Sequence, residues 1–142
     1  MGLRSWISDF WHCRQRQVSL GERGEREAER FLKKLGYKIV ARHDRGRLGE
    51  LDLVAVDGRT VVFVEVKTRR DDESGSPAEA VDERKQAKLT RLALGYLKRH
   101  GLLECAARFD VVAITWPDEA QKPNIVHYIN AFQPVGAGQM FS

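Results

Sequence analysis

The feature that most constrains the fold is a run of β-branched and aromatic residues from Thr60 to Lys67, preceded by a similar segment from Leu51 to Val56. They meet at Asp57-Gly58, a dipeptide typical of tight β-hairpin turns. Alternate residues of a strand share a face, and both faces of the second segment are apolar in its middle. Such a strand is buried on both sides, as a central strand is. The sequence therefore predicts a sheet covered on both faces.

Further elements surround this hairpin. Apolar residues spaced three and four apart predict a helix from Gly21 that ends at Gly36, and a second helix from about Pro77 to His100. Residues 37–41, 109–116 and 125–131 are predicted strands, and residues 42–47 a polar, basic turn. The order α-β-β-β-α-β-β indicates an α/β fold with a central mixed sheet flanked by helices.

The 142 residues suffice for one domain. We assign residues 21–132 to it, residues 1–20 to an N-terminal amphipathic extension and residues 133–142 to a loose tail. The extension carries Trp6, Ile7, Phe10 and Trp11 on one side of a short helix. That pattern suits a membrane surface, a partner's groove, packing on this domain, or a fraying terminus.

Charged residues at the end of the Thr60–Lys67 strand are costly unless something compensates their burial. A two-residue turn at Asp57-Gly58 places Glu65 diagonal to Asp52, and a turn two residues longer places the two acids directly opposite. In either register Asp52, Glu65 and Lys67 share one face of adjacent strands, where cross-strand Cβ atoms are about 5 Å apart. Alternation also puts Glu50 on the face of Asp52, with Leu51 and Leu53 on the other.

Two carboxylates this close repel each other, and a divalent cation relieves the repulsion. Oxygen ligands without nearby Cys or His favour Mg²⁺ or Mn²⁺, and the carbonyl of Val66 is a natural further ligand. Such an ion promotes phosphodiester hydrolysis, and the ammonium of Lys67 can orient water or neutralise charge on the phosphate. The alternative is a structural salt bridge from Lys67 to Asp52 or Glu65.

Two further acids need an explanation. Glu25 lies one turn before the apolar stripe of the first helix, so it is either a core-facing acid with a partner or a helix-start acid favoured by the helix dipole. Asp110 interrupts an apolar strand, and we interpret it as a buried structural acid paired with an arginine.

The formal net charge of +4 mildly favours a polyanionic partner. Basic residues precede the Asp52 strand, follow the Glu65 strand and form a stripe on the second helix that contains Arg84, Lys88, Arg91 and Lys98. They either contact phosphates or are solvated surface charges. The candidates for nucleic-acid binding are Arg42, Arg45, Arg47, Arg69, Lys85 and Lys88.

Asp52 and the tripeptide Glu65-Val66-Lys67 resemble the signature of the restriction-endonuclease-like (PD-(D/E)xK) superfamily, although Leu51 stands where its proline would be. The wider segments from Gly49 to Val54 and from Phe63 to Arg69 look like the YraN family of predicted bacterial endonucleases, and the resemblance extends from about Gly21 to Asn130. It implies a restriction-endonuclease-like core.

Archaeal Holliday-junction resolvases are similar but more distant. Their first-helix glutamate matches Glu25, so the resemblance implies that Glu25 is a ligand of the metal or of its water. Related nucleases also place a Gln or Lys near the position of Lys85. Because these resolvases act as dimers, the resemblance allows a homodimer.

Our leading hypothesis is a metal-dependent endonuclease that hydrolyses DNA, including branched or repair intermediates, in preference to RNA. The alternative is a non-catalytic nucleic-acid-binding module in a repair, recombination or DNA-uptake complex. Cys13 and Cys105 form no paired motif, which indicates a reducing compartment. No apolar run approaches the roughly 20 residues of a membrane span. We therefore expect a cytoplasmic protein without integral membrane association.

Overall fold

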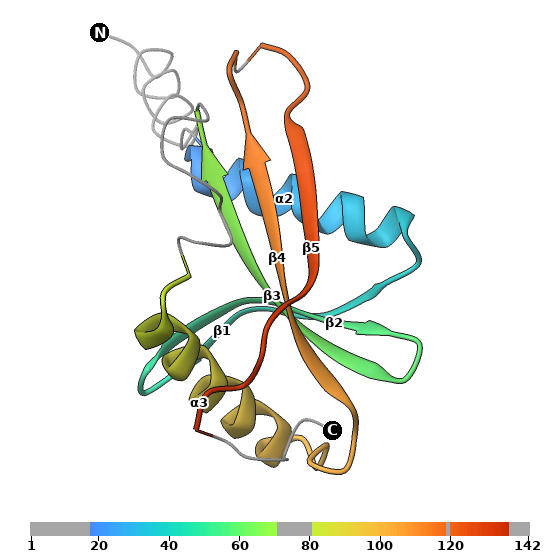
Figure 1. Ribbon diagram of the computed structural model, residues 1–142. Coiled ribbons are helices and arrows are strands. Elements are labelled where there is room, and N and C mark those ends of the chain that lie inside the picture. Colours follow the sequence, from blue (N-terminus) through green and yellow to red (C-terminus); the bar gives the residue numbers. More distant parts are fainter. Residues whose placement is uncertain (1–17, 71–80, 119, 137–142) are drawn as a thin grey trace, which may run out of the picture.

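The computed structural model describes residues 18–70, 81–118 and 120–136. In this part of the chain five strands form a sheet in chain order: β1 (Lys38–Gly46), β2 (Gly49–Asp57), β3 (Thr60–Arg69), β4 (Ala107–Thr115) and β5 (Asn124–Phe132). β3 and β4 run parallel, and the other neighbours are antiparallel. Helices α2 (Leu20–Lys34) and α3 (Glu83–Arg99) pack on the sheet (Figure 1). The predicted element order and mixed sheet are confirmed.

The two helices cover opposite faces of β3. Val61 and Phe63 belong to the apolar cluster that contains the buried residues of α3. Val62 and Val64, which alternate with them, pack in the cluster that contains Ala28 and Leu32 of α2. Each fully buried side chain of this size contributes about 1.5–3 kcal/mol. The prediction of a central strand buried on both faces is therefore confirmed.

Two predicted boundaries are wrong. The chain from Arg42 to Gly46, expected to be a turn, continues β1, because its backbone pairs with β2 and its polar side chains are tolerated on an edge strand. α3 begins at Glu83, not near Pro77, because Asp82 has an extended backbone and its carboxylate accepts a hydrogen bond from Lys85 N at 2.8 Å. That bond caps the helix.

The N-terminal extension predicted for residues 1–20 and the tail predicted for residues 133–142 lie largely outside the described residues. Within the tail, the N–H of Val135 donates to Thr90 Oγ1 at 3.1 Å. No helix in the described ranges is long and apolar enough to cross a membrane.

Candidate active site

The β2–β3 hairpin sets the position of the two strand acids. Its turn is Gly58-Arg59, with φ of +61° at Gly58, and Asp57 pairs with Thr60. The turn predicted at Asp57-Gly58 is thus displaced by one residue, because glycine takes the positive-φ position at the start of the turn. Pairing runs to Leu53 opposite Val64. Continued by one step, this register would set Asp52 opposite Glu65, which is the register expected from a longer turn, but the pairing itself ends at Leu53.

Regular strand geometry breaks at Asp52. Leu51 packs in the cluster with α3, whereas Leu53 packs in the cluster with α2. The expectation that Leu51 and Leu53 share a face is therefore wrong. The neighbouring β1 residue, His43, has φ of +49°, and both His43 and Asp52 are left out of the β1–β2 pairing although the register is the same on either side of them. Because the strand alternation shifts here, the Asp52 carboxylate can turn toward β3, where its Oδ2 accepts a hydrogen bond from Val66 N at 2.9 Å.

The environment of Asp52 disfavours its charge. Burial, followed by the negative charge of Glu65, raises the pKa of Asp52 from its usual 3.8 to about 7, although the hydrogen bond from Val66 opposes the shift. Asp52 forms no ion pair with any residue that the structure describes. The Glu65 side chain is only 7% exposed. The structure thus brings two strand acids together in a place where one carboxylate lacks a counter-charge.

Two lysines meet at Glu65. Lys67 Nζ lies 3.5 Å from Glu65 Oε1, and Lys85 Nζ, from the first turn of α3, lies 2.8 Å from the same oxygen. Burial opposes the charged form of Lys85, but the contact with Glu65 outweighs it and raises the pKa of Lys85. Lys67 therefore forms the ion pair with Glu65 that the structural interpretation predicted. A catalytic ammonium would occupy the same place beside the two carboxylates, so the contact is compatible with both interpretations.

Glu25 approaches the site from α2 through a histidine. Its Oε2 lies 2.8 Å from His43 Nε2, and the other ring nitrogen of His43 contacts Glu50 Oε1. Burial raises the pKa of Glu25, and its charge in turn raises the pKa of Asp52. Within the described ranges, no three His, Cys, Asp or Glu side chains are grouped tightly enough to hold a metal. Glu25 therefore lies at the margin of the Asp52–Glu65 pair and does not share a ligand cluster with it.

Sequence reasoning missed His43. Its role depends on β1 lying beside Asp52 and on its positive φ, and no spacing in the sequence signals either feature. The hydrogen bond that His43 Nδ1 donates to the Glu50 carboxylate is the main cause that raises the pKa of His43. We interpret the Glu25–His43–Glu50 chain as the link that fixes α2 against the strand bearing Asp52.

Gly24 allows α2 to approach this site. A Cβ atom at Gly24 would lie 1.9 Å from Thr68 Oγ1 and 2.9 Å from Thr68 Cβ. Real Cβ atoms do not approach other atoms this closely, so any side chain at residue 24 must push α2 away from β3. Because α2 lies this close to β3, the charge of the adjacent Glu25 acts on Asp52 and raises its pKa.

We expect Gly24→Ala to lower the free energy of unfolding by about 1–3 kcal/mol, even though alanine favours helices, because the added methyl group collides with β3. Urea unfolding measures this loss. Gly21→Ala is the matched control in the same helix, since its Cβ would meet nothing closer than Ser19 Oγ at 3.9 Å. In a Thr68→Gly background the cost of Gly24→Ala should shrink; an unchanged cost would show that the collision is not its cause.

The candidate phosphate-binding arginines of β1 and of the β1–β2 turn differ in whether they contact a carboxylate. Arg42 binds Glu29 of α2 through both its Nε, at 2.8 Å, and its Nη2. The hydrogen bond from Arg42 is the main cause that lowers the pKa of Glu29 to about 2. Arg45 Nε donates to Glu50 at 3.1 Å, whereas Arg47 is exposed in the β1–β2 turn. Arg42 thus braces β1 against α2.

The remaining candidates flank Glu65. Arg69 ends β3, and its carbonyl accepts a hydrogen bond from Trp116 N at 2.8 Å. Lys85 contacts Glu65 directly, and Lys88 follows one turn later on the exposed side of α3. The structure therefore places Lys85 in the acid site and Lys88 beside it.

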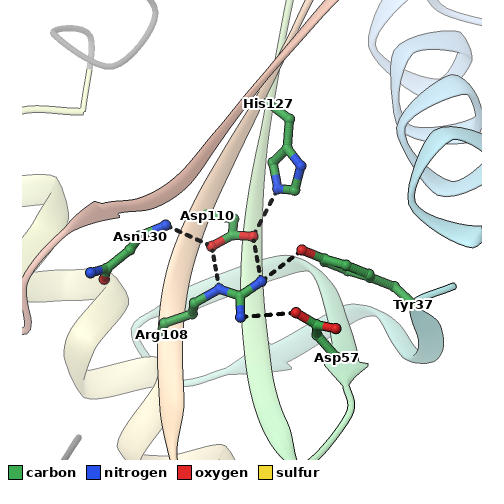
Figure 2. Close-up of polar contacts among 6 residues, drawn as sticks. All are labelled: Tyr37, Asp57, Arg108, Asp110, His127 and Asn130. Atoms are coloured by element: carbon green, nitrogen blue, oxygen red, sulfur yellow. Dashed lines mark hydrogen bonds and ion pairs between the residues drawn. The ribbon is translucent and has the colours of Figure 1, made fainter. Parts of the chain in front are cut away.

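Asp110 belongs to a separate polar network (Figure 2). It is fully buried, and its carboxylate accepts hydrogen bonds from Arg108 Nε at 3.0 Å and from Asn130 N at 3.0 Å. His127 Nε2 lies 2.8 Å from its other oxygen. Arg108 also reaches Tyr37 Oη, at 2.7 Å. The interpretation of Asp110 as a buried structural acid paired with an arginine is confirmed.

These features define an α/β protein in which a mixed sheet carries paired carboxylates on adjacent strands. Residues 24–114 match the model of a family described as "Uncharacterised protein family UPF0102". A UPF0102 protein of Rhodopirellula baltica is 43% identical over 143 residues, which cover 98% of this chain and 86% of the relative. One of Geobacter sulfurreducens is 50% identical over 116 residues, covering 80% and 88%. The chain belongs to the UPF0102 family, the YraN family that its strand motifs indicated.

Proposed function

We propose that this protein is a Mg²⁺- or Mn²⁺-dependent endonuclease that hydrolyses phosphodiester bonds in DNA. The observation that carries the proposal is the pairing of Asp52 with Glu65 at the break in β2, where burial and mutual repulsion raise the pKa of Asp52 to about 7. A divalent cation would remove this repulsion. The proposal includes DNA in preference to RNA and the cytoplasm as its compartment, as the sequence led us to expect.

The donor set fits such an ion. Asp52 and Glu65 would hold it, with the Val66 carbonyl completing an all-oxygen set that suits hard cations. Glu25, whose nearest charged contact is His43, is positioned to orient a water molecule on the α2 side. When bound, the ion would stabilise negative charge on the scissile phosphate and make a bound water more acidic.

The chain supplies the remaining functions. Lys67 stands beside Glu65, so its ammonium can donate a hydrogen bond to the attacking water or to a phosphate oxygen. Lys85 neutralises Glu65 from the α3 side and keeps that carboxylate in place. The backbone N–H of Val66 orients Asp52 through a hydrogen bond of 2.9 Å. Together these contacts hold two acids and an amine around the place where a phosphate would bind.

Cleavage of labelled single-stranded and nicked DNA in Mn²⁺ tests the proposal. We expect Asp52→Asn and Lys67→Met each to lower the rate by at least about 10²-fold, because each removes charge stabilisation needed in the transition state. Asp118→Asn, an exposed acid in the loop after β4, is the matched control and should retain the wild-type rate. Equal rates in all four proteins would show that the activity comes from a contaminant or another site.

A non-catalytic nucleic-acid-binding module is favoured by one observation, namely that Lys67 and Lys85 already neutralise Glu65. A carboxylate with two ammonium partners does not require a metal for charge balance. Calorimetric titration with Mn²⁺ distinguishes the two functions. A nuclease should bind the ion in a manner abolished by Asp52→Asn, whereas a binding module should give the same heats for both proteins.

A further inference from the structure

A basic groove lies between the N-terminal half of α3 and the β1–β2 turn. This α3 groove is a cavity of about 490 Å³ lined by Leu48, Asp82, Arg84, Lys85, Lys88 and Arg91. Lys85 connects it with the candidate active site, because its Nζ lies 2.8 Å from Glu65 Oε1. A ligand in the groove would therefore extend directly from the two strand acids.

Three of the four cations that line the α3 groove lack an ion-pair partner among the described residues. Arg84, Lys88 and Arg91 are spaced four and three residues apart, so they share one face of the helix. None of the three forms an ion pair within the described ranges. The one acid in the lining, Asp82, uses its carboxylate to cap α3. Cations held this close repel one another, and a polyanion relieves the repulsion.

On the side of the β1–β2 turn, the groove is lined by one apolar residue, Leu48. A Cβ at Gly49, where φ is +143°, would lie 2.7 Å from Lys88 Cε, and one at Gly46 would lie 3.2 Å from Leu92 Cδ2. These two glycines let the β1–β2 turn pack directly on α3. The turn in consequence holds Leu48, 46% exposed, across from the cations.

We infer that the α3 groove binds an unpaired nucleic-acid strand next to the scissile phosphate, an inference that rests on the proposed function. The strand's phosphates contact Arg84, Lys88 and Arg91, and one of its bases packs on Leu48. In a duplex the bases are paired and stacked, so an apolar side chain opposite the phosphate contacts reaches a base face only by prying base steps apart, at an energetic cost. In a single strand the base faces are free for side chains to pack on. The inference therefore names a substrate that is single-stranded on the α3 side.

Binding measured in chelator, where no divalent ion is present, tests the phosphate contacts without cleavage. The probes are a fluorescent oligothymidylate of about 16 nucleotides and its duplex with oligoadenylate. We expect Arg84→Gln and Arg91→Gln each to weaken binding of the single strand several-fold and to reduce its salt slope by about 0.7. Lys38→Gln, an exposed change on β1, should have no such effect.

Two outcomes would contradict this part of the inference. One is tighter binding of the duplex than of the single strand by the wild-type protein. The other is an equal loss on Lys98→Gln, because Lys98 belongs to the same basic stripe of α3 but does not line the groove. That result would assign binding to the helix surface in general.

The base contact is tested with Leu48→Ala. We expect this change to weaken binding of oligothymidylate about 3- to 10-fold, somewhat less than loss of an aromatic stacking contact, and to leave binding of an abasic strand of equal length unchanged. Leu103→Ala, at a leucine that is 40% exposed elsewhere, is the control. Equal losses on both strands would overturn the base contact.

Cleavage in Mn²⁺, recorded for the same proteins, separates the two proposals. Groove-dependent binding by a wild-type protein that cleaves nothing would contradict the nuclease and retain the groove. Cleavage that depends on Asp52 would support the nuclease. If the groove variants then bind the single strand as the wild type does, binding in the α3 groove alone would be contradicted.

Discussion

Arg108→Leu should lower the free energy of unfolding by about 3–5 kcal/mol, because it leaves a buried carboxylate without its counter-charge. Asp110 is 0% exposed, and Arg108 supplies two of its hydrogen bonds, at 3.0 and 3.3 Å. Arg108 also donates to Asp57 at the hairpin turn and to Tyr37 before β1. Its loss therefore releases several strands at once (Figure 2). Urea unfolding at neutral pH measures the change.

The surface pair Arg99–Asp44 provides the matched control. Its atoms lie 2.7 Å apart, but the Arg99 side chain is 50% exposed, so Arg99→Leu should cost no more than about 1 kcal/mol. The double variant Arg108→Leu/Asp110→Asn should recover part of the loss, because a neutral amide does not need a counter-charge. Equal costs for Arg108→Leu and Arg99→Leu would contradict the role assigned to burial.

The central part of the fold follows from local pattern. The alternating apolar residues of β3 identify a strand buried on two faces, whatever surrounds it. The predicted boundaries of β1 and α3 are wrong because backbone pairing sets the end of β1 and capping sets the start of α3. Arg42 to Gly46 contain few apolar residues, yet they form strand because β2 offers them hydrogen-bond partners. The start of α3 is fixed by Asp82, through its extended backbone and the hydrogen bond that its carboxylate accepts from Lys85 N.

The candidate site was predictable to a similar degree. Alternation and the hairpin limited Asp52 and Glu65 to two registers, both of which made them neighbours. The contacts of Lys85 and His43 were beyond sequence reasoning, because they depend on where α3 and β1 dock. The need for glycine at residue 24 was also beyond sequence reasoning, because Gly24 meets Thr68 only once α2 lies on β3. Contacts within one hairpin are encoded locally, whereas those between elements require the tertiary structure.

Asp52→Asn should stabilise the protein at about pH 8 and have no effect below about pH 4. The pKa of Asp52 is about 7 in the folded protein against its usual 3.8. Between these values the folded state binds the proton more tightly than the unfolded chain does, so stability falls as the pH rises. Above pH 7 the full cost of the ionised carboxylate is present. A difference of about three pKa units corresponds to an upper bound of about 4 kcal/mol, and thermal unfolding in chelator measures it.

The stability gained on Asp52→Asn, and its dependence on pH, test whether the ionised Asp52 carboxylate is the group that would bind the metal. Asp118→Asn is the control, because it removes an exposed acid and should leave the pH dependence unchanged. A gain that is equal at about pH 4 and about pH 8 would show that the ionised carboxylate is not the cause. Mn²⁺ at about 100 times its dissociation constant should raise wild-type stability by about 2.7 kcal/mol and leave Asp52→Asn unchanged. The residue that destabilises the metal-free protein at high pH would then be the one that stabilises it when the ion binds.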